Sequence, residues 1–199
     1  MGKLDLGSIN LLYPTPVTLV GVLVGGKPNI ITIAHIGIIE YTPVHLISIS
    51  MNKRHYSNAG IQENETFSIN LPSLEMVEVV DFCGIHSGRN KDKGALFNLF
   101  YGKVKTAPMV DECPINMECK LYRTIDIYKH NIYIGEIVSA YCDDKIIEDG
   151  TPNPYKANPI LFSFYNKEYW RMGERVATAW AVGKDFRPSL RWAKREKEN

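Results

Sequence analysis

Residues 87–94, Ser-Gly-Arg-Asn-Lys-Asp-Lys-Gly, carry groups that could bind an anionic ligand. The segment combines one hydroxyl, four charged side chains and two glycines in eight residues. Gly88 lets the backbone approach a ligand closely, Ser87 can donate or accept a hydrogen bond, and Lys93 supplies positive charge. A solvated charged loop is the alternative, and this segment alone does not decide between the two.

A second candidate anion site is Lys53-Arg54-His55-Tyr56-Ser57, between an expected strand and a short helix. Arg54 can bind phosphate oxygens through two parallel N–H groups. Ser57 offers a hydroxyl, and the free N–H groups of the helix after it attract anions. A solvated turn with a helix cap explains this segment equally well when it is taken alone. Two such segments in one near-neutral chain favour a cofactor with a phosphate over a polyanion.

Polar side chains also interrupt residues 29–35, Asn-Ile-Ile-Thr-Ile-Ala-His, which we expect in a strand. At a strand edge, backbone amides and the Thr32 hydroxyl could hydrogen-bond a heteroaromatic ring. An ordinary strand whose polar side faces solvent gives the same pattern, so both interpretations stay open here.

The histidines and cysteines show no spacing typical of a metal site. No His-x-His or His-x-x-x-His pair occurs among His35, His45, His55, His86 and His130, and no carboxylate is placed as a third ligand; we therefore expect no metal. The four cysteines, Cys83, Cys113, Cys119 and Cys142, form no Cys-x-x-Cys pair. We expect them to be reduced thiols, with an electron relay through Cys83 and Cys119 as a minor alternative. A Gly-x-Ser-x-Gly elbow and a Rossmann glycine fingerprint are also absent.

Length and charge limit the class of protein. The 199 residues predict a single domain over residues 1–186, followed by a basic tail at 187–199. The formal net charge of +1 does not provide the basic face that nucleic-acid binding needs. We find no signal-peptide pattern and no apolar run of the ~18 residues that a membrane span requires. A cytoplasmic protein that binds neither nucleic acid nor membrane is expected.

The elements that must position these residues are mostly strands. Alternation and apolar runs predict strands at residues 17–24, 30–39, 45–50, 67–71, 117–128 and 131–141, and a last hairpin at 160–164 and 168–172. Helices are expected at 57–63 and 73–84, and an irregular loop at 149–159. This pattern favours a mainly β, closed antiparallel barrel. Because so small a barrel is filled by its own side chains, a large ligand must bind outside it, in a groove or at a subunit interface.

Several segments, in this order and spacing, resemble those of the flavin reductase-like proteins, including the flavoredoxins. The segments are Tyr-Pro-Thr-Pro-Val at 13–17, Pro-Asn-Ile-Ile-Thr at 28–32, Ile-Ser at 49–50 with 53–57, Phe-Ser-Ile-Asn-Leu at 67–71, and Gly-Ile-His-Ser-Gly at 84–88 with Asp-Lys at 92–93. The resemblance implies a six-stranded antiparallel split β-barrel of the FMN-binding type. It also implies a homodimer with one FMN per subunit, bound near the interface.

The resemblance implies a role for each candidate residue. Arg54 and Ser57 are expected at the phosphate, and Ser87, Gly88 and Lys93 are expected to close the site. The full expected cofactor-binding set is Asn29, Thr32, Ala34, His35, Ser50, Arg54, Tyr56, Ser57, Ser87, Gly88 and Lys93. His130 fits the place of a histidine that lies near the nicotinamide or the flavin in several members, as a modulating group.

The leading hypothesis is therefore an FMN-dependent oxidoreductase. It would pass electrons from NADH or NADPH through FMN to free flavin, a ferric chelate or a redox protein. Two departures affect the donor: Tyr128-Lys129 stands where many members have Gly-Asp, and His35 stands where relatives often have an aromatic residue. An FMN electron-transfer protein reduced by a ferredoxin-like partner is the alternative. A barrel that binds no flavin and acts as a sensor or structural partner is a third hypothesis.

Overall fold

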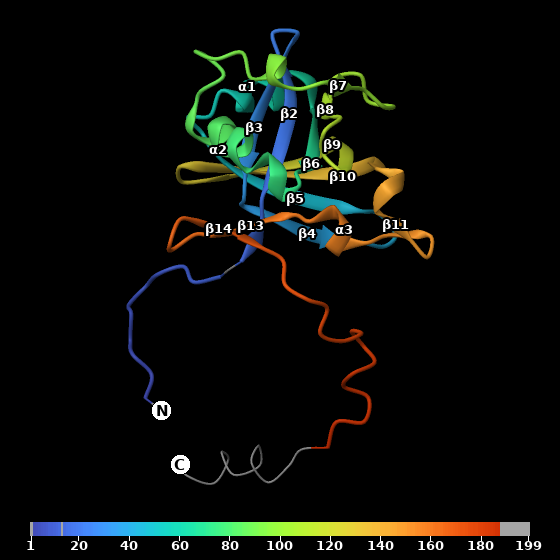
Figure 1. Ribbon diagram of the computed structural model, residues 1–199. Helices are drawn as coiled ribbons and strands as arrows, with labels where there is room; N and C mark the ends of the chain where they lie inside the picture. Colours follow the sequence, from blue (N-terminus) through green and yellow to red (C-terminus); the bar gives the residue numbers. More distant parts are fainter. Residues whose placement is uncertain (1, 13, 188–199) are drawn as a thin grey trace.

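The computed structural model describes residues 2–12 and 14–187. A seven-stranded antiparallel sheet forms the body of the molecule (Figure 1). Across the sheet the strands are β3 (Lys27–Ile33), β2 (Thr18–Val24), β6 (Thr66–Leu71), β9 (Ile115–Ile127), β10 (His130–Cys142), β5 (Leu46–Asn52) and β4 (Ile36–Glu40). The mainly β class is confirmed. The predicted count of six strands is wrong for this sheet, because residues 30–39 form parts of two strands.

The sheet is curled around one apolar core. Residues of β3 and β5, which lie far apart in the strand order, belong to the same buried cluster. Ile31 and Ile33 of β3 pack in it with Ile47 and Ile49 of β5. Their spacing of two residues is that of side chains on one face of a strand. These buried side chains fill the interior, so a large ligand has no space inside.

A tight turn sets the register of the first hairpin. Gly25 and Gly26 have φ angles of 55° and 75°, which two-residue hairpin turns of type I′ require at both central positions. The turn is shorter than the gap between the strands predicted at 17–24 and 30–39, since β3 already begins at Lys27. Asn29 is therefore a strand residue, and Pro28 is tolerated because β3 is the last strand in the sheet order.

The strand predicted at residues 30–39 is interrupted after Ile33. β3 ends there and β4 begins at Ile36, which leaves Ala34 and His35 at the junction. β4 then pairs with β5, and the His35 carbonyl accepts a hydrogen bond of 2.8 Å from the Ser50 amide. The junction therefore places His35 beside Ser50.

The long hairpin was predicted correctly. β9 and β10 pair antiparallel from Ile115 opposite Cys142 to Ile127 opposite His130. Tyr128 and Lys129 make the turn, and Tyr128 has a φ of 45°. His130 is thus the first residue of β10, opposite Asn52 at the end of β5.

Short helices pack against the sheet. α1 (Ser57–Asn64) packs on β2, and α2 (Val77–Ile85), preceded by the 3₁₀ turn η1 (Leu74–Met76), packs on β3. Val80 and Cys83 are the buried residues of α2, so the predicted helix at 73–84 is confirmed with a 3₁₀ first turn. The other helical turns are η2 (Gly94–Leu96), η3 (Asp144–Ile146) and α3 (Pro154–Ala157).

A second, three-stranded sheet lies at the lower side of the body, at the level of β4 in the view of Figure 1. Its order is β1 (Thr15–Pro16), β13 (Ile160–Ser163) and β14 (Glu168–Arg171). Two further pairs are β7 (Leu99–Phe100) with β8 (Met109–Val110), and β11 (Ile147–Glu148) with β12 (Thr151–Pro152). The expected last hairpin is β13–β14, whereas the expected irregular loop at 149–159 contains β12 and α3.

The chain leaves the body at both ends (Figure 1). No regular element precedes Thr15 or follows Arg171 among the described residues. Apart from Arg187, the basic tail predicted at 187–199 lies outside the described part. Within residues 2–12 and 14–187, no helix has the length and apolar character needed to cross a bilayer.

Candidate functional site

Two loops that are distant in sequence meet beside β3. A Cβ added to Gly88, in the loop after α2, would lie 2.0 Å from Oδ1 of Asn29 and 3.0 Å from Cδ1 of Tyr56. Only a residue without a side chain allows so close a backbone approach. The Arg89 guanidinium lies 5.0 Å from the centre of the Tyr56 ring, a cation–π contact. The structure therefore brings the segments at 53–57 and 87–94 together.

A cavity of about 260 Å³, hereafter the loop cavity, opens between these two segments. The first loop contributes Arg54, Tyr56 and Ser57, and the second contributes Ser87, Gly88 and Lys93. A neighbouring cavity of about 380 Å³ shares Asn29, Tyr56, Gly88 and Lys93 with it. Hydroxyls and cations from both loops thus face one space.

The start of α1 contributes a buried hydroxyl to the loop cavity. Ser57, the first residue of α1, is fully buried, and its Oγ accepts a 2.6 Å hydrogen bond from Nδ2 of Asn29. No side chain caps α1. The N–H groups of Asn58 and Ala59 donate to the carbonyls of His55 and Tyr56 at 3.2 and 3.3 Å, which leaves the Ser57 N–H as the donor at the start of α1 that an anion could use.

Lys93 is a buried cation without an anionic partner. Its side chain is 2% exposed, and its Nζ donates hydrogen bonds of 2.9 Å to the carbonyls of Cys83 and His86 at the end of α2. Burial lowers the pKa of Lys93 because it penalises the charged form. No ion pair with a carboxylate forms at Lys93 in the part of the chain that the structure describes. Since buried charges are normally paired, an anion in the loop cavity would complete this environment.

A second cavity, of about 480 Å³, continues from the loop cavity and shares His55 with it. We call it the histidine cavity, because His35, His55 and His130 all line it. Its other lining residues are Val17, Thr32, Ile33, Ala34, Ser50, Asn52, Phe162, Phe164 and Tyr169. None of them is a lysine, arginine, aspartate or glutamate. The two joined cavities therefore differ in chemistry, one cationic and the other aromatic and uncharged.

Aromatic contacts hold His35 in place. Its ring is stacked on Phe164 with centroids 4.4 Å apart and planes at 15°, and it meets His130 edge-on at 6.0 Å. Phe164 in turn contacts Phe162 at 5.2 Å. Burial, and secondarily the nearby His130, lower the pKa of His35. The His35 imidazole is therefore held in its neutral form more firmly than a free one.

His55 stands where the two cavities join. Its Nδ1 is buried and has no hydrogen-bond partner within residues 2–12 and 14–187. Burial lowers the pKa of His55, with smaller contributions from Lys93 and His130. A buried nitrogen without a partner is unusual in a folded protein and is free to bond a ligand at this junction.

Every predicted site residue lines the loop cavity, its neighbour or the histidine cavity. Asn29, Arg54, Tyr56, Ser57, Ser87, Gly88 and Lys93 lie at the loop end, and Thr32, Ala34, His35, Ser50 and His130 lie at the other. Their roles toward a cofactor stay predictions. One detail differs from expectation: the Thr32 hydroxyl donates to the Val80 carbonyl of α2, so this group is already engaged.

The sequence did not indicate the aromatic wall of the histidine cavity. Phe164 and Tyr169 belong to the β13–β14 region, more than a hundred residues after the strands that they face. The Tyr169 hydroxyl donates a 2.8 Å hydrogen bond to Asp81 of α2, which ties this hairpin to the body. The hairpin itself was predicted, but no local pattern encodes where it docks. The sequence also did not indicate that Asn52 lines this cavity or that His55 lies where the two cavities meet, because both positions depend on packing between elements.

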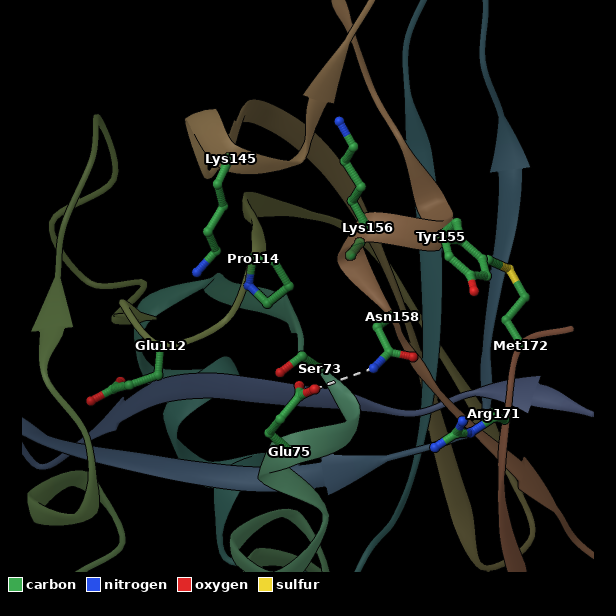
Figure 2. A pocket seen from close by; sticks show the side chains of 11 residues that line it. Ser73, Glu75, Glu112, Pro114, Lys145, Tyr155, Lys156, Asn158, Arg171 and Met172 are labelled. Atoms are coloured by element: carbon green, nitrogen blue, oxygen red, sulfur yellow. Dashed lines mark hydrogen bonds between the residues drawn. The ribbon is translucent and has the colours of Figure 1, made fainter. Parts of the chain in front are cut away.

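A separate cavity of about 510 Å³ lies near η3 and α3 (Figure 2). None of the predicted site residues lines it. Two of its cations are paired, Lys145 with Asp143 at 2.9 Å and Lys156 with Glu148 at 3.5 Å, whereas Arg171 has no ion pair among the described residues. Figure 2 also shows Glu75 hydrogen-bonded to Asn158, at 3.3 Å. Both of these paired lysines are also far more exposed than the buried Lys93.

Solved structures with high similarity are flavoredoxins. The flavoredoxin of Methanosarcina acetivorans shares 36% sequence identity with this chain at a TM-score of 0.89, covering 92% of this chain and 98% of its own. The flavoredoxin of Desulfovibrio vulgaris (Miyazaki F) shares 37% identity at a TM-score of 0.85, covering 92% and 100%. Among curated proteins, one from Pyrococcus abyssi is 26% identical over 160 residues, which are 80% of this chain and 89% of the relative.

The family model described as "Flavin reductase like domain" matches residues 10–170. That match spans the main sheet, both loops and the three histidines of the site. The two flavoredoxins agree with it in fold and in sequence over nearly the whole described chain. The chain belongs to the flavin reductase-like family of flavin oxidoreductases.

Proposed function

We propose that this protein is an FMN-dependent oxidoreductase, which passes electrons from a reduced nicotinamide to an acceptor such as free flavin, a ferric chelate or a redox protein. The observation that carries the proposal is the pair of joined cavities. The loop cavity has cations and hydroxyls, and the histidine cavity has aromatic and neutral polar walls. A flavin mononucleotide has the same two chemical ends, a phosphate and a heteroaromatic ring.

The loop cavity fits a phosphate. Arg54 can donate two parallel hydrogen bonds to phosphate oxygens, and the buried Lys93 gains the anionic partner that it lacks. The hydroxyls of Ser57 and Ser87 and the N–H group of Ser57 at the start of α1 supply further donors. The close contact of Gly88 with Asn29 and Tyr56 fixes the second loop against the first.

The histidine cavity fits the ring. Ala34, Ser50 and the β3–β4 junction offer small side chains and backbone amides beside it. FMN, when bound, supplies the hydride and electron chemistry. The protein orients the ring, keeps water away with Phe162 and Phe164, and places N–H groups where negative charge develops. His130 lies at the same cavity as a modulating group.

Binding of FMN is tested by the absorption spectrum of the purified protein and by quenching of FMN fluorescence on titration into apoprotein. We expect a yellow protein with one FMN per chain. A colourless protein that leaves FMN fluorescence unquenched would overturn the proposal. FAD titrated in parallel tests the choice of cofactor, because its adenosine must also be accommodated beyond the loop cavity.

A second candidate is an electron-transfer flavoprotein that does not use nicotinamide. The turn Tyr128-Lys129 favours it, since the long and largely exposed Tyr128 and Lys129 replace small or acidic residues next to His130. Anaerobic mixing with NADH and with NADPH separates the two candidates. Bleaching of the flavin absorbance supports the reductase, whereas an unchanged spectrum that bleaches only with a reduced ferredoxin supports the alternative.

We also propose a homodimer. β4 is the last strand at its end of the sheet order, and it carries the apolar Ile38 at 79% exposure and Ile39 at 51%. Exposed apolar side chains on an edge strand are unfavourable in an isolated chain. Light scattering after gel filtration should give the mass of two chains, and Ile38→Lys should shift it toward one. A monomeric wild-type protein would refute the dimer.

A further inference from the structure

We propose that His35, His55 and His130, hereafter the histidine cluster, together take up one proton when negative charge arrives on the ring bound beside them. The inference rests on the proposed binding of FMN and adds a role for this chain's own residues. It concerns the proton balance of the site, which neither the fold nor the family assignment determines.

The permanent positive charges of the site lie away from the histidine cavity. The permanent cations of the groove, Arg54 and Lys93, line the loop cavity and not the histidine cavity. A phosphate bound there carries up to two negative charges, which these two cations would offset. The histidine cavity has no lysine, arginine or carboxylate in its lining. Additional negative charge on the ring therefore has no fixed counter-charge in the lining of its own cavity, and Lys93, which acts on His55 from outside that lining, would already be offset by the phosphate.

The histidine cluster can change its own charge when negative charge arrives on the ring. His35 and His130 are 6.0 Å apart and perpendicular, and His55 lines the same cavity with a buried, unpartnered Nδ1. An imidazole changes charge near neutral pH more readily than any other side chain. Burial already lowers the pKa of His35 and of His55, so both start neutral, and nearby negative charge raises an imidazole pKa.

The other groups around the cluster do not compete for the proton. Lys93 faces it from the loop before η2 and is bonded to two carbonyls. Tyr169 faces it from β14; burial and Asp81 raise the pKa of Tyr169, so it stays a neutral phenol. Asp81 accepts the Tyr169 hydrogen bond on α2, and Arg54 lines only the loop cavity. The three imidazoles are therefore the groups at this cavity that can take up the proton.

The balance of the step is simple. A hydride brings two electrons and one proton to the ring and leaves one net negative charge on it. A second proton comes from solvent and adds to a ring nitrogen of the cluster. The site as a whole then gains two electrons and two protons, and its net charge is that of the oxidised state.

The test is the pH dependence of the midpoint potential of the FMN-loaded protein between about pH 5 and 8, where imidazoles titrate. Each proton taken up with two electrons shifts the potential by about 30 mV per pH unit, the value of a tenfold change for a two-electron couple. We expect a slope of about 60 mV in the wild type and about 30 mV in a variant in which all three imidazoles are removed, His35→Gln/His55→Gln/His130→Gln. His45→Gln is the matched control, because His45 is exposed and lines none of these cavities.

Three outcomes overturn the proposal. A wild-type slope of about 30 mV means that no second proton is taken up. Equal slopes of about 60 mV in the wild type and the triple variant mean that the ring itself takes both protons. Failure of the wild type to bind FMN overturns the proposed function and this inference together. If the triple variant does not fold, the second outcome is read from the wild type alone: NMR signals of all three imidazoles that show no protonation on photoreduction lead to the same conclusion.

Discussion

The two ends of the groove are built on different principles. At the loop end, fixed contacts hold permanent charge: Lys93 is tied to two carbonyls, Ser57 to Asn29, and Gly88 lies against Asn29 and Tyr56. At the other end, imidazole and phenyl rings surround a larger cavity. Nδ1 of His55 there has no hydrogen-bond partner among the described residues. Charges that are held in place before binding favour tight binding of an anion. Imidazoles, in contrast, can gain or lose a proton near neutral pH.

This difference implies that affinity and reactivity are carried by separate residues. Variants at the loop end should weaken FMN binding, and variants at the histidine end should change proton and electron behaviour at nearly constant affinity. The predictions below test that division.

The largest effect is expected for Gly88→Val. The new side chain would collide with Asn29 and Tyr56, and overpacking of this kind costs about 1–3 kcal/mol. The displaced loop would also withdraw Ser87 and Lys93 from the phosphate. FMN affinity should fall by about a hundredfold or more, measured by fluorescence titration.

The control for Gly88→Val is Gly173→Val, because nothing lies within 4 Å of a Cβ at that position. It should bind FMN as the wild type does. Wild-type affinity in Gly88→Val would show that the two loops need not meet to hold the phosphate.

A second prediction compares two adjacent cations. Arg54→Ala should cost about 1.5–3 kcal/mol of FMN binding, or roughly ten- to a hundredfold in Kd, because a charge-assisted hydrogen bond to the phosphate is lost. Lys53→Ala should change Kd little, since Lys53 pairs with Asp126 at 2.7 Å outside the cavity. Isothermal titration calorimetry of both variants gives the comparison. Equal losses would assign the effect to general charge and not to Arg54.

The loop end was largely predictable from sequence, and there is a physical reason. Glycine beside charged and hydroxyl residues, as in 87–94, is a local signal, and so is a serine at the expected start of α1. Even so, the sequence did not indicate that Lys93 is buried, with its Nζ bonded to carbonyls at the end of α2. Burial depends on packing between elements, which a local pattern does not contain.

The histidine end was predicted only in part. The alternation of residues 29–35 indicated a strand with polar positions, and the family resemblance added Ser50 and His130. Phe164 could not be found, because its contact with His35 depends on how the β13–β14 hairpin docks on the body. The break between β3 and β4 was missed as well, because the apolar run of residues 30–39 continues through it.

A third prediction concerns that missed contact. Phe164→Ala removes the ring stacked on His35 and exposes the imidazole to water. Since burial is the main cause that lowers the pKa of His35, this pKa should rise toward its ordinary value, while Kd for FMN changes less than in Arg54→Ala. NMR titration of the His35 ring protons in the apoprotein measures the shift. Tyr165→Ala is the control, because Tyr165 is 61% exposed; a larger rise there than in Phe164→Ala would contradict the stacking argument.

The smallest effect is on acid stability. Both His35 and His55 have a pKa below the ordinary 6.5 in the folded apoprotein, so below pH 6.5 the unfolded chain binds protons that the folded chain does not. The free energy of unfolding should therefore be unaffected by these groups above pH 6.5. It should decrease as the pH falls from 6.5 toward the folded pKa values, and then level off. Urea denaturation of apoprotein at a series of pH values measures this decrease.

His35→Gln should make the decrease shallower, because one of the two responsible groups is gone, and His45→Gln should leave it as in the wild type. The same experiment with FMN bound separates the two ends of the groove. Phosphate binding at the loop end raises stability at every pH, whereas the pH-dependent part belongs to the histidines. If Arg54→Ala altered the pH dependence as much as His35→Gln does, the two ends would be coupled, and the division of affinity from proton chemistry would fail.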